Sequence, residues 1–369
     1  MAVKVPCVVI DNGSYTCKIG LGRDVEPRIF IPSRSGYCND QSEMIGNELK
    51  DYNVINKFGY NTSVLNLKHP IERGVITNWD DMEKIWLHAF KELKVAPAES
   101  SVLLTEAVFN PKYNREKMAE IMFEKFNTHA LCIADQASLS LYASGRNTGM
   151  SVNVGHGITQ IVPVYKGSVK REAAVQWEFG GVDMTDYLTS MLTERGYSFD
   201  SPSQTETVRN IKEKCCYVAL DFEQEMQTAA SEKYKLPDKQ VITIGNERFR
   251  TPELLFQPSL IHEGSEGIHV RIRDSIIKCN RWIKMPQFHK IVLSGGSTTF
   301  RGFAQRLRKE MSSILAPATI FKIIDHGELK YATWLGGAAL ASLSIFKDWC
   351  ISREEYNEHG SNILDKKYT

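Results

Sequence analysis

The residues best suited to chemistry lie near the start of the chain, where residues 8–18 read Val-Val-Ile-Asp-Asn-Gly-Ser-Tyr-Thr-Cys-Lys. β-Forming residues lead into Asp-Asn-Gly-Ser, the composition of a tight hairpin turn. Gly13 can adopt a positive φ, so successive backbone amides can point into one concavity and bind an anion. Asp11 would hold the waters of a metal ion there, and Lys18 would point back at a phosphate. The alternative is an ordinary buried hairpin.

A second stretch repeats this pattern further along the chain. Residues 151–165 read Ser-Val-Asn-Val-Gly-His-Gly-Ile-Thr-Gln-Ile-Val-Pro-Val-Tyr, again two β-forming runs around an Asx residue and glycines. A third turn, Ser-Gly-Gly, follows the β-forming run that begins at Ile291. Two phosphate-type hairpins in successive halves, with a later Gly-Gly turn, are what a two-lobed nucleotide clamp requires.

Composition narrows the class of protein. A chain of 369 residues exceeds what one hydrophobic core usually serves, so two or more lobes are expected. The 45 basic and 44 acidic residues give a formal net charge of +1, which offers no electrostatic case for binding nucleic acid or an anionic membrane. No apolar run approaches bilayer-spanning length, and the N-terminus does not read as a signal peptide. The eight cysteines lack metal-ligand spacing, which favours reduced thiols in a cytosolic or nuclear compartment.

Hydrophobic periodicity predicts the elements that follow the first hairpin. Asn78 is a good N-cap for a helix whose apolar positions, from Met82 to Leu93, fall on one face. We expect short strands at 101–104 and 131–134, and helices at 114–126 and 136–144. Gln136 then follows the carboxyl end of a strand, where α/β sheets present their chemistry. On local grounds, Asp135-Gln136 is equally suited to capping the helix.

The second half carries a matching set of elements. Gly180-Gly181 lie in a turn that either admits phosphates or only redirects the chain. We expect helices at 184–195, 205–222, 252–256, 269–279, 303–315 and 338–346, and a hairpin at 241–249 that turns at Gly245-Asn246. Residues 33–68 are expected to form a loop-rich insertion, and 352–369 a mostly polar tail after the ordered core.

Several of these motifs together resemble the actin family. They are Asp-Asn-Gly-Ser at 11–14, Leu-Leu-Thr-Glu at 103–106, Leu-Tyr-Ala-Ser-Gly at 141–145, and the stretches 70–82, 221–230, 240–249, 293–296 and 334–343. The resemblance spans nearly the whole chain and implies an α/β, actin-like two-lobed fold, with four subdomains around a nucleotide cleft. It assigns 1–32, 70–143 and 331–369 to subdomain 1, 33–69 to subdomain 2, 144–179 and 264–330 to subdomain 3, and 180–263 to subdomain 4.

The resemblance also implies ligands and roles, because actins bind ATP or ADP with Mg²⁺ and hydrolyse ATP slowly. Asp11 would hold Mg²⁺ through water, and Gln136 would orient the attacking water. The implied nucleotide contacts are Asp11, Asn12, Gly13, Ser14, Tyr15, Lys18, Asn153, Gly155, His156, Gly157, Ile158, Gly181, Lys212, Glu213, Gly295, Gly296, Phe300 and Lys330. The residues implied to line a groove for protein partners are Tyr142, Gly145, Leu343 and Phe346.

The departures from the family pattern concern hydrolysis. Asn153 and His156 stand where actins carry acidic residues, Gln160 stands in place of a histidine, and Tyr15 replaces a glycine. Losing a carboxylate near a divalent ion could cost a few kcal/mol at an effective dielectric near ~20. Each ~1.4 kcal/mol lost from the transition state alone slows a reaction tenfold. We therefore expect nucleotide binding with weak or absent turnover, although His156 and Gln160 could also be neutral changes in a working site.

The surfaces used for assembly by actins differ as well. The family's flexible subunit-gripping loop looks truncated between Pro32 and Pro70, with extra residues at 52–61. Leu-Ile-His-Glu at 260–263 replaces an apolar plug, and burial of Glu263 without a partner would be strongly unfavourable. Arg73 replaces a histidine that actins methylate.

Three functions are compatible with these observations. The first is a divergent actin-related protein, a nucleotide-binding structural subunit of a cytoskeletal, axonemal or nuclear assembly, contacting protein subunits that could include actin or actin-binding proteins. It is expected in the cytoplasm or cytoskeleton and to contact neither nucleic acid nor membrane directly. The second is a conventional polymerising ATPase that forms or joins actin filaments. The third is an enzyme, since sugar kinases share the architecture, but no residue stands out as its catalytic carboxylate.

Overall fold

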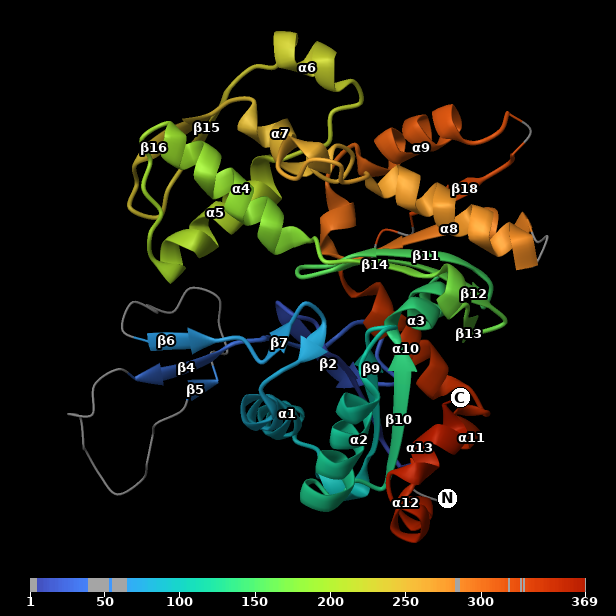
Figure 1. The fold of residues 1–369 in the computed structure, drawn as a ribbon. Helices are drawn as coiled ribbons and strands as arrows, with labels where there is room; N and C mark the ends of the chain where they lie inside the picture. The colour runs from blue at the N-terminus through green and yellow to red at the C-terminus, as the bar shows by residue number, and fades with distance from the viewer. Residues whose placement is uncertain are drawn as a thin grey trace.

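Two α/β units, drawn in the lower and upper halves of Figure 1, make up the protein. The structure, a computed structural model, describes residues 5–38, 53–54, 65–282, 286–317, 319–325, 327 and 329–368. Each unit is built on a mixed sheet flanked by helices (Figure 1). The fold is the α/β, actin-like one that the sequence predicts.

The first unit is organised around a six-stranded sheet in the order β19-β10-β9-β1-β2-β3. Strands β1 (Cys7–Asp11) and β2 (Thr16–Leu21) form an antiparallel hairpin, and β1 runs parallel to β9 (Ser101–Glu106). The remaining strands are β3 (Ile29–Pro32), β10 (Ala130–Asp135) and β19 (Ile351–Ser352). Its helices include α1 (Trp79–Leu93), α2 (Lys112–Glu120), α3 (Gln136–Ala143) and α10 (Ala332–Ser342).

The second unit repeats this plan with the order β13-β12-β11-β17-β18. Here β11 (Gly149–Val154) and β12 (Thr159–Tyr165) form the antiparallel hairpin, and β11 runs parallel to β17 (Lys290–Ser294). The other strands are β13 (Ser168–Val169), β18 (Lys322–Ile324) and β14 (Val175–Trp177), which pairs with β12. Helices α8 (Ile268–Trp282) and α9 (Phe303–Ile314) pack with this sheet.

The repeat places equivalent residues of the two hairpins in register. Asp11 pairs with Lys18 across the first hairpin, and Asn153 pairs with Gln160 across the second. Asn153 is also aligned with Ser294 on β17, as Asp11 is aligned with Thr105, the residue after the last β1–β9 pair. The topology therefore makes Asn153 the counterpart of Asp11.

Each unit carries an outer extension. On the second unit it contains α4 (Gly181–Glu194), α5 (Pro202–Cys215), α6 (Phe222–Thr228), α7 (Glu247–Glu253) and the hairpin of β15 (Glu232–Lys235) with β16 (Val241–Ile244). On the first unit it contains a three-stranded sheet of β4 (Ser35–Cys38), β5 (Asn53–Val54) and β6 (Leu65–Lys68). Strands β7 (Ile71–Glu72) and β8 (Val75–Ile76) lead from it to α1.

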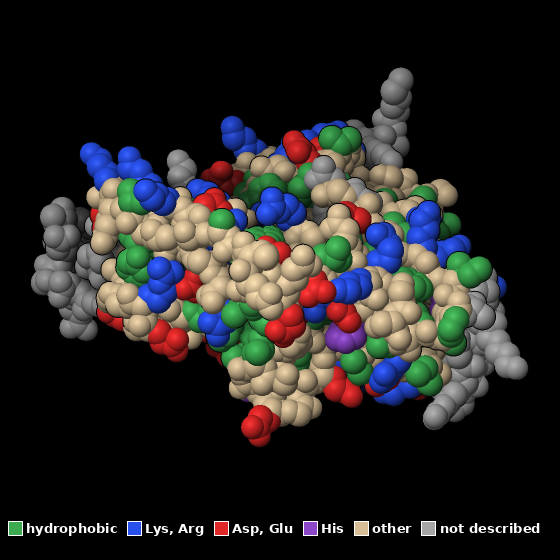
Figure 2. Space-filling model, turned by 90° about the horizontal axis from the view of Figure 1, so that it is seen from above, with side chains coloured by type: hydrophobic (Ala, Val, Ile, Leu, Met, Phe, Trp, Pro, Cys, Tyr) green, Lys and Arg blue, Asp and Glu red, His purple; other side chains and the backbone are tan. Residues whose placement is uncertain are grey.

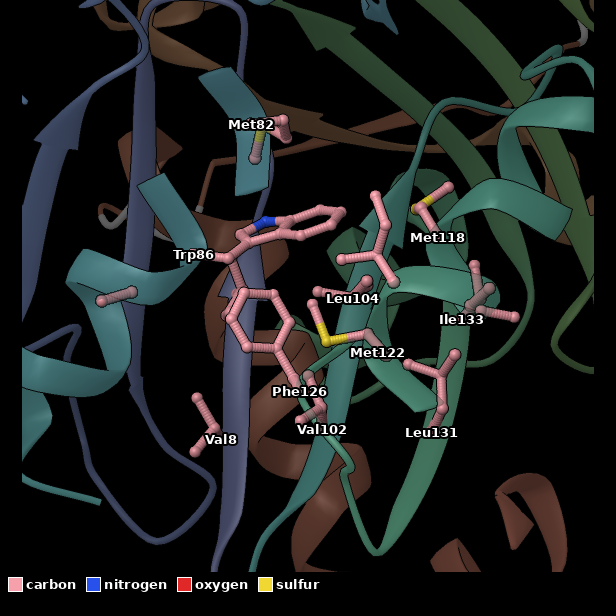
Figure 3. Close-up of a cluster of buried hydrophobic side chains, with 14 of the residues drawn as sticks. Val8, Met82, Trp86, Val102, Leu104, Met118, Met122, Phe126, Leu131 and Ile133 are labelled. Atoms are coloured by element: carbon pink, nitrogen blue, oxygen red, sulfur yellow. The ribbon is translucent and has the colours of Figure 1, made fainter. Parts of the chain in front are cut away.

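Apolar stripes on the helices close the core over the first sheet. Figure 3 shows Trp86 reaching from α1 toward Leu104 on β9, with Met122 and Phe126 beside it. The Trp86 indole N–H donates to Asn12 Oδ1 at 3.1 Å, so the core also holds the turn of the first hairpin. Between the units, α3 packs against α10, and a Cβ at Gly336 would lie 1.7 Å from the Leu139 carbonyl oxygen. Only glycine permits this close crossing.

Several boundary predictions were wrong. Helix α5 ends at Cys215 instead of continuing to 222. The hairpin predicted at 241–249 forms between β15 and β16, and Gly245-Asn246 leads into α7 instead of turning between strands. The helix predicted at 338–346 begins at Ala332 and ends at Ser342, and Phe346 instead begins the short helix α11 (Phe346–Trp349).

The predicted polar tail belongs to the ordered core. Helices α12 (Arg353–His359) and α13 (Asn362–Lys367) bury Tyr356, Ile363 and Leu364 against the first sheet. Amphipathic spacing within a mostly polar segment is enough to do this, which the overall polarity of the segment concealed. Of the expected insertion at 33–68, three short strands are described, and the predictions for residues 39–52 and 55–61 lie outside the described residues.

Across the described ranges, none of the helices has the length and apolar character that crossing a membrane demands. The seven cysteines whose side chains the structure describes are free thiols. On the face shown in Figure 2, basic and acidic side chains are interspersed, in keeping with the near-zero net charge.

Candidate functional site

A cavity of ≈ 830 Å³ lies between the two units and receives the tips of both hairpins. That volume is within the range of small-molecule sites. Every residue that the sequence assigned to nucleotide contact lines it: Asp11, Asn12, Gly13, Ser14, Tyr15, Lys18, Asn153, Gly155, His156, Gly157, Ile158, Gly181, Lys212, Glu213, Gly295, Gly296, Phe300 and Lys330, together with Gln136. Residues from seven separate parts of the chain therefore meet at one place.

The first hairpin holds a buried carboxylate at the base of the cavity. Lys18 Nζ lies 2.8 Å from Asp11 Oδ2, and Thr105 Oγ1 donates to Asp11 Oδ1 at 2.9 Å. Gln136 Nε2 also donates to Asp11 Oδ1, at 3.1 Å. This hydrogen bond orients the Gln136 side-chain amide through its nitrogen. The side-chain oxygen of Gln136 is then left to accept a hydrogen bond from another group. Asp135 caps α3 through the Ser138 amide, so the capping role falls to Asp135 while Gln136 faces the cavity.

Both hairpin turns direct their carbonyl groups outward. In the first, Ser33 binds the carbonyl oxygens of Gly13 and Tyr15 at 2.5 and 2.8 Å. In the second, the amides of Gly181 and Val182 bind the carbonyl oxygens of Gly155 and His156, both at 2.9 Å. The Gly157 carbonyl accepts from the guanidinium of Arg73 at 2.8 Å.

The amides of the same turns are left available. Among the residues that the structure describes, the backbone N–H groups of Ser14, His156 and Gly157 donate no hydrogen bond. Buried amides are nearly always paired, so an unpaired set around a cavity indicates a place for an acceptor. A Cβ at Gly13 would lie 2.7 Å from the Thr16 carbonyl oxygen, so the first turn needs its glycine. At Gly296 a Cβ would meet nothing within 4 Å, because this backbone faces the open space of the cavity.

The second hairpin has the backbone shape of the first but lacks its two charged side chains. Asn153 takes the place of Asp11, and the buried hydroxyl of Ser294 beside it has no hydrogen-bond partner within the described ranges. In the first hairpin the equivalent hydroxyl of Thr105 donates to the carboxylate. Gln160, the counterpart of Lys18, is buried and donates to Gln176 at 3.0 Å, and it does not line the cavity.

Two aromatic rings meet at the tips of the hairpins. The Tyr15 and His156 ring centroids lie 5.0 Å apart. Burial, followed by the nearby positive charge of Lys212, lowers the pKa of His156 to about 3. His156 is therefore neutral at physiological pH and adds no charge to the site.

Helix α5 and the turns after β17 and β18 also line the cavity. The Lys212 ammonium donates to the Gly181 carbonyl at 2.6 Å and to Thr185 Oγ1 at 2.8 Å, so it holds the start of α4. Burial lowers the pKa of Lys212 to about 8. Lys330 Nζ lies 3.6 Å from Glu213 Oε2.

The site has hydrogen-bond donors for a nucleotide but few carboxylates that could bind its metal ion. The carboxylates that line the described cavity are those of Asp11, Glu213 and Glu232, of which only Asp11 belongs to a hairpin. The described residues contain no group of three or more His, Cys, Asp or Glu side chains placed to hold a metal ion. Mg²⁺ is commonly bound by one or two carboxylates together with phosphates and waters. The residues present therefore fit a metal that arrives with a nucleotide.

Cross-unit contacts at the phosphate end were not predicted. Arg73 makes a bidentate pair with Asp183 on α4, at 2.7 and 2.8 Å. Tyr15 donates to Glu206 on α5 at 3.0 Å, and Arg209 lies over the Tyr15 ring. Helical spacing could have indicated Arg209, which lies one turn before Glu213 and also lines the cavity. The partners of Tyr15 and Arg73 gave no local signal.

A second hollow, of ≈ 830 Å³, lies near α10, α11 and β13. Tyr142, Gly145 and Leu343 line it, as the resemblance implied. Phe346 does not, because it is only 7% exposed and packs in the core beneath. Ile345 and Trp349, which are exposed apolar residues, line this hollow instead. We call it the α10 groove.

Comparison with models of protein families agrees with this architecture. The family described as Actin matches residues 2–369, the whole of the chain but its first residue.

Proposed function

The chain belongs to the actin family, and from this premise we propose that it is a nucleotide-binding structural subunit of a protein assembly, with weak or absent ATP hydrolysis. The proposed ligand is ATP or ADP with Mg²⁺, and the proposed setting is the cytoplasm, the cytoskeleton or a nuclear complex. The observation that carries the proposal is the contrast between the hairpins. Both offer main-chain amides to one cavity, but only the first supplies a carboxylate.

Nucleotide binding would use the backbone first. The amides of Ser14, His156 and Gly157 would donate to phosphate oxygens, and Lys18 would add a positive charge. Asp11 would hold Mg²⁺ through water, and the metal would supply charge neutralisation for the phosphates. The base and ribose would lie toward Phe300, Glu213 and Lys330, which line the other end of the cavity.

Turnover is expected to be weak because the groups that would assist the attacking water are altered. The oxygen of Gln136 can accept a hydrogen bond from water, since its nitrogen is held by Asp11. Among the described residues, the second hairpin supplies no carboxylate that could help it, because Asn153 is neutral. His156 is a poor proton acceptor with a pKa of about 3, and Gln160 is turned toward Gln176. Phosphoryl transfer depends on positioning and charge stabilisation, so these losses affect hydrolysis more than binding.

The test is a pair of measurements on purified full-length protein. Binding of a fluorescent adenine nucleotide in Mg²⁺ is expected to saturate, while phosphate release stays far below that of a conventional actin assayed beside it. Actin-like phosphate release would contradict the second half of the proposal, and absence of any binding would contradict the first. Sedimentation in Mg²⁺ and salt addresses the alternative function, since a conventional polymerising ATPase would pellet.

We also propose that the α10 groove binds a partner segment with apolar residues flanked by carboxylates. Three of its lining residues, Leu343, Ile345 and Trp349, are apolar and 37–52% exposed. The charged residues that line it in the described structure are Arg146, Lys166 and Lys290, all of them basic. Charge complementarity therefore favours an acidic amphipathic segment.

Two labelled helical peptides with the same apolar face would test this choice. The peptide flanked by Glu is expected to bind more tightly than the one flanked by Lys, with a preference that weakens as salt is raised. Leu343→Asp should abolish binding of both. Equal binding of the two peptides would contradict the selection by charge.

A further inference from the structure

Tyr15 links the tip of the first hairpin to the opposite unit. Its hydroxyl lies 3.0 and 3.1 Å from the two carboxylate oxygens of Glu206, on α5. The Arg209 guanidinium carbon lies 4.4 Å from the centroid of the Tyr15 ring, and the His156 ring lies beside that ring at an interplanar angle of 44°. One side chain of the first unit thus contacts three residues of the second.

Glu206 is the centre of a desolvated ion cluster. It forms an ion pair with Arg209 on its own helix, and Arg34 Nη1 lies 3.9 Å from its Oε2. The side chains of Glu206, Arg209 and Arg34 are only 15%, 12% and 9% exposed. Arg34 lies between β3 and β4 of the first unit, so the cluster joins the units at a second point.

Protonation states keep this cluster intact at neutral pH. Burial opposes ionisation of Glu206, but its hydrogen bond with Arg209 lowers the pKa of this carboxyl overall. Burial raises the pKa of the Tyr15 phenol, which therefore remains a hydrogen-bond donor. A hydrogen bond to a charged acceptor is among the stronger kinds in proteins.

The position of the cluster matters more than its strength. Tyr15 follows Ser14, and His156 precedes Gly157, so the two touching rings adjoin the amides proposed to hold phosphates. Beside them, Arg73 joins the second hairpin and α4 through Gly157 and Asp183. The phosphate end of the cavity is therefore spanned by side chains from both units.

We propose that Tyr15, Glu206 and Arg209 form a gate across the phosphate end of the cavity, which must open before a nucleotide enters or leaves. The inference rests on the proposed nucleotide binding and concerns its regulation. The first hairpin and α5 separate only when the Tyr15–Glu206 contact breaks. The rate at which this gate opens therefore sets the rate of nucleotide release. The glycine that the family pattern has at position 15 could make none of these contacts, which makes the gate a property of this chain.

The test measures release rates from the full-length protein. Protein loaded with a fluorescent ATP analogue (mant-ATP) in Mg²⁺ is mixed with excess unlabelled ATP, and the loss of fluorescence is followed. Tyr15→Phe keeps the ring and removes the hydroxyl, and it is expected to speed release about tenfold. Glu206→Gln should do the same. Tyr356→Phe is the matched control, because it removes a Tyr–Glu hydrogen bond of the same 3.0 Å length that lies in the core of the first unit. Its release rate should equal that of the wild type.

The outcomes separate the gate from the proposed function. Tyr15→Phe that binds mant-ATP and releases it at the wild-type rate overturns the gate and leaves nucleotide binding intact. Failure of every form to bind overturns the proposed function and the gate with it. Hydrogen exchange without nucleotide gives a second reading, since the amide of Ser33, which binds the Tyr15 carbonyl, should exchange faster in Tyr15→Phe than in the wild type. Equal exchange would count against the gate.

Discussion

The two hairpins of this protein share a backbone plan and differ in chemistry. Both are antiparallel pairs beside a parallel strand, and both end in turns whose amides face one cavity. In the first, Asp11 is bound by Lys18, Thr105 and Gln136. In the second, Asn153 is neutral and the hydroxyl of Ser294 has no partner in the described chain.

The difference shows that the atoms that shape an anion-binding turn are not the atoms that act on the ligand. The glycines and outward-bonded carbonyls that make an anion-binding turn are present on both sides. The carboxylate and its donors, which act on a metal ion and a water molecule, remain on one side only. A fold of this kind can keep a ligand as a structural element after losing the groups that would transform it.

The largest expected effect comes from removing the charge of the first hairpin. Asp11→Asn leaves the ammonium of Lys18, which is 18% exposed, without its partner. The free energy of unfolding should fall by about 3 kcal/mol, the cost typical of breaking a buried ion pair. Asn153→Ser, at the equivalent position of the second hairpin, breaks no ion pair and should cost less than half as much. Equal losses in denaturant titrations would show that the hairpins are more alike than their side chains indicate.

Glycine replacements test the shape that the hairpins share. In Gly13→Ala the new Cβ would lie 2.7 Å from the Thr16 carbonyl oxygen, and in Gly157→Ala it would lie 3.2 Å from the Cα of Arg73. We expect losses of about 2 and about 1 kcal/mol respectively, because both contacts are with backbone and the first is much the closer. Thermal unfolding measures both, and a reversed order would refute the geometric reason.

Measuring stability as a function of acidic pH would reveal the contribution of His156, the histidine of the second hairpin. His156 has a pKa of about 3 when folded, against 6.5 for an unperturbed histidine, so between these values the unfolded chain binds one more proton. Stability must therefore fall as pH is lowered through this window, by about 2 kcal/mol from pH ~6.5 to ~5. His156→Gln should lose that part of the slope, whereas replacement of the exposed His129 should leave it. Parallel slopes for His156→Gln and the wild type would exclude the buried, neutral state.

The last expected effect is a gain, the partial restoration of phosphate release. Asn153→Asp places a carboxylate beside the unpaired hydroxyl of Ser294, where it can accept a hydrogen bond and act on the metal ion. Phosphate release should rise about tenfold, equivalent to ~1.4 kcal/mol of transition-state stabilisation. Asn357→Asp, on the exposed surface of α12, is the control for added charge. A folded, nucleotide-binding Asn153→Asp that shows no rise would place the block elsewhere, at Gln160 or Tyr15.

Local composition was a good guide to the hairpins and a poor one to the ends of several elements. The turns at Gly13 and Gly157 were predicted because glycine between β-forming runs marks a tight turn, where a Cβ would meet neighbouring backbone. The hairpin near Gly245 was misplaced because a turn composition also suits the start of a helix, and packing of α7 decided between them. The last two helices were missed because a few apolar side chains, such as Ile363 and Leu364, are buried only once the first sheet is present.

The sequence alone determined the two glycine-rich hairpin turns, the places of Asp11 and Lys18 on the first hairpin, and the neutral residues of the second hairpin, since each depends on neighbours within a few positions. Tertiary structure decided that Tyr15 meets Glu206, 191 residues away, that Gln160 turns toward Gln176, and that Phe346 is buried. These contacts depend on packing within each unit and between the units, and the local pattern of residues does not specify which distant side chain will be the partner.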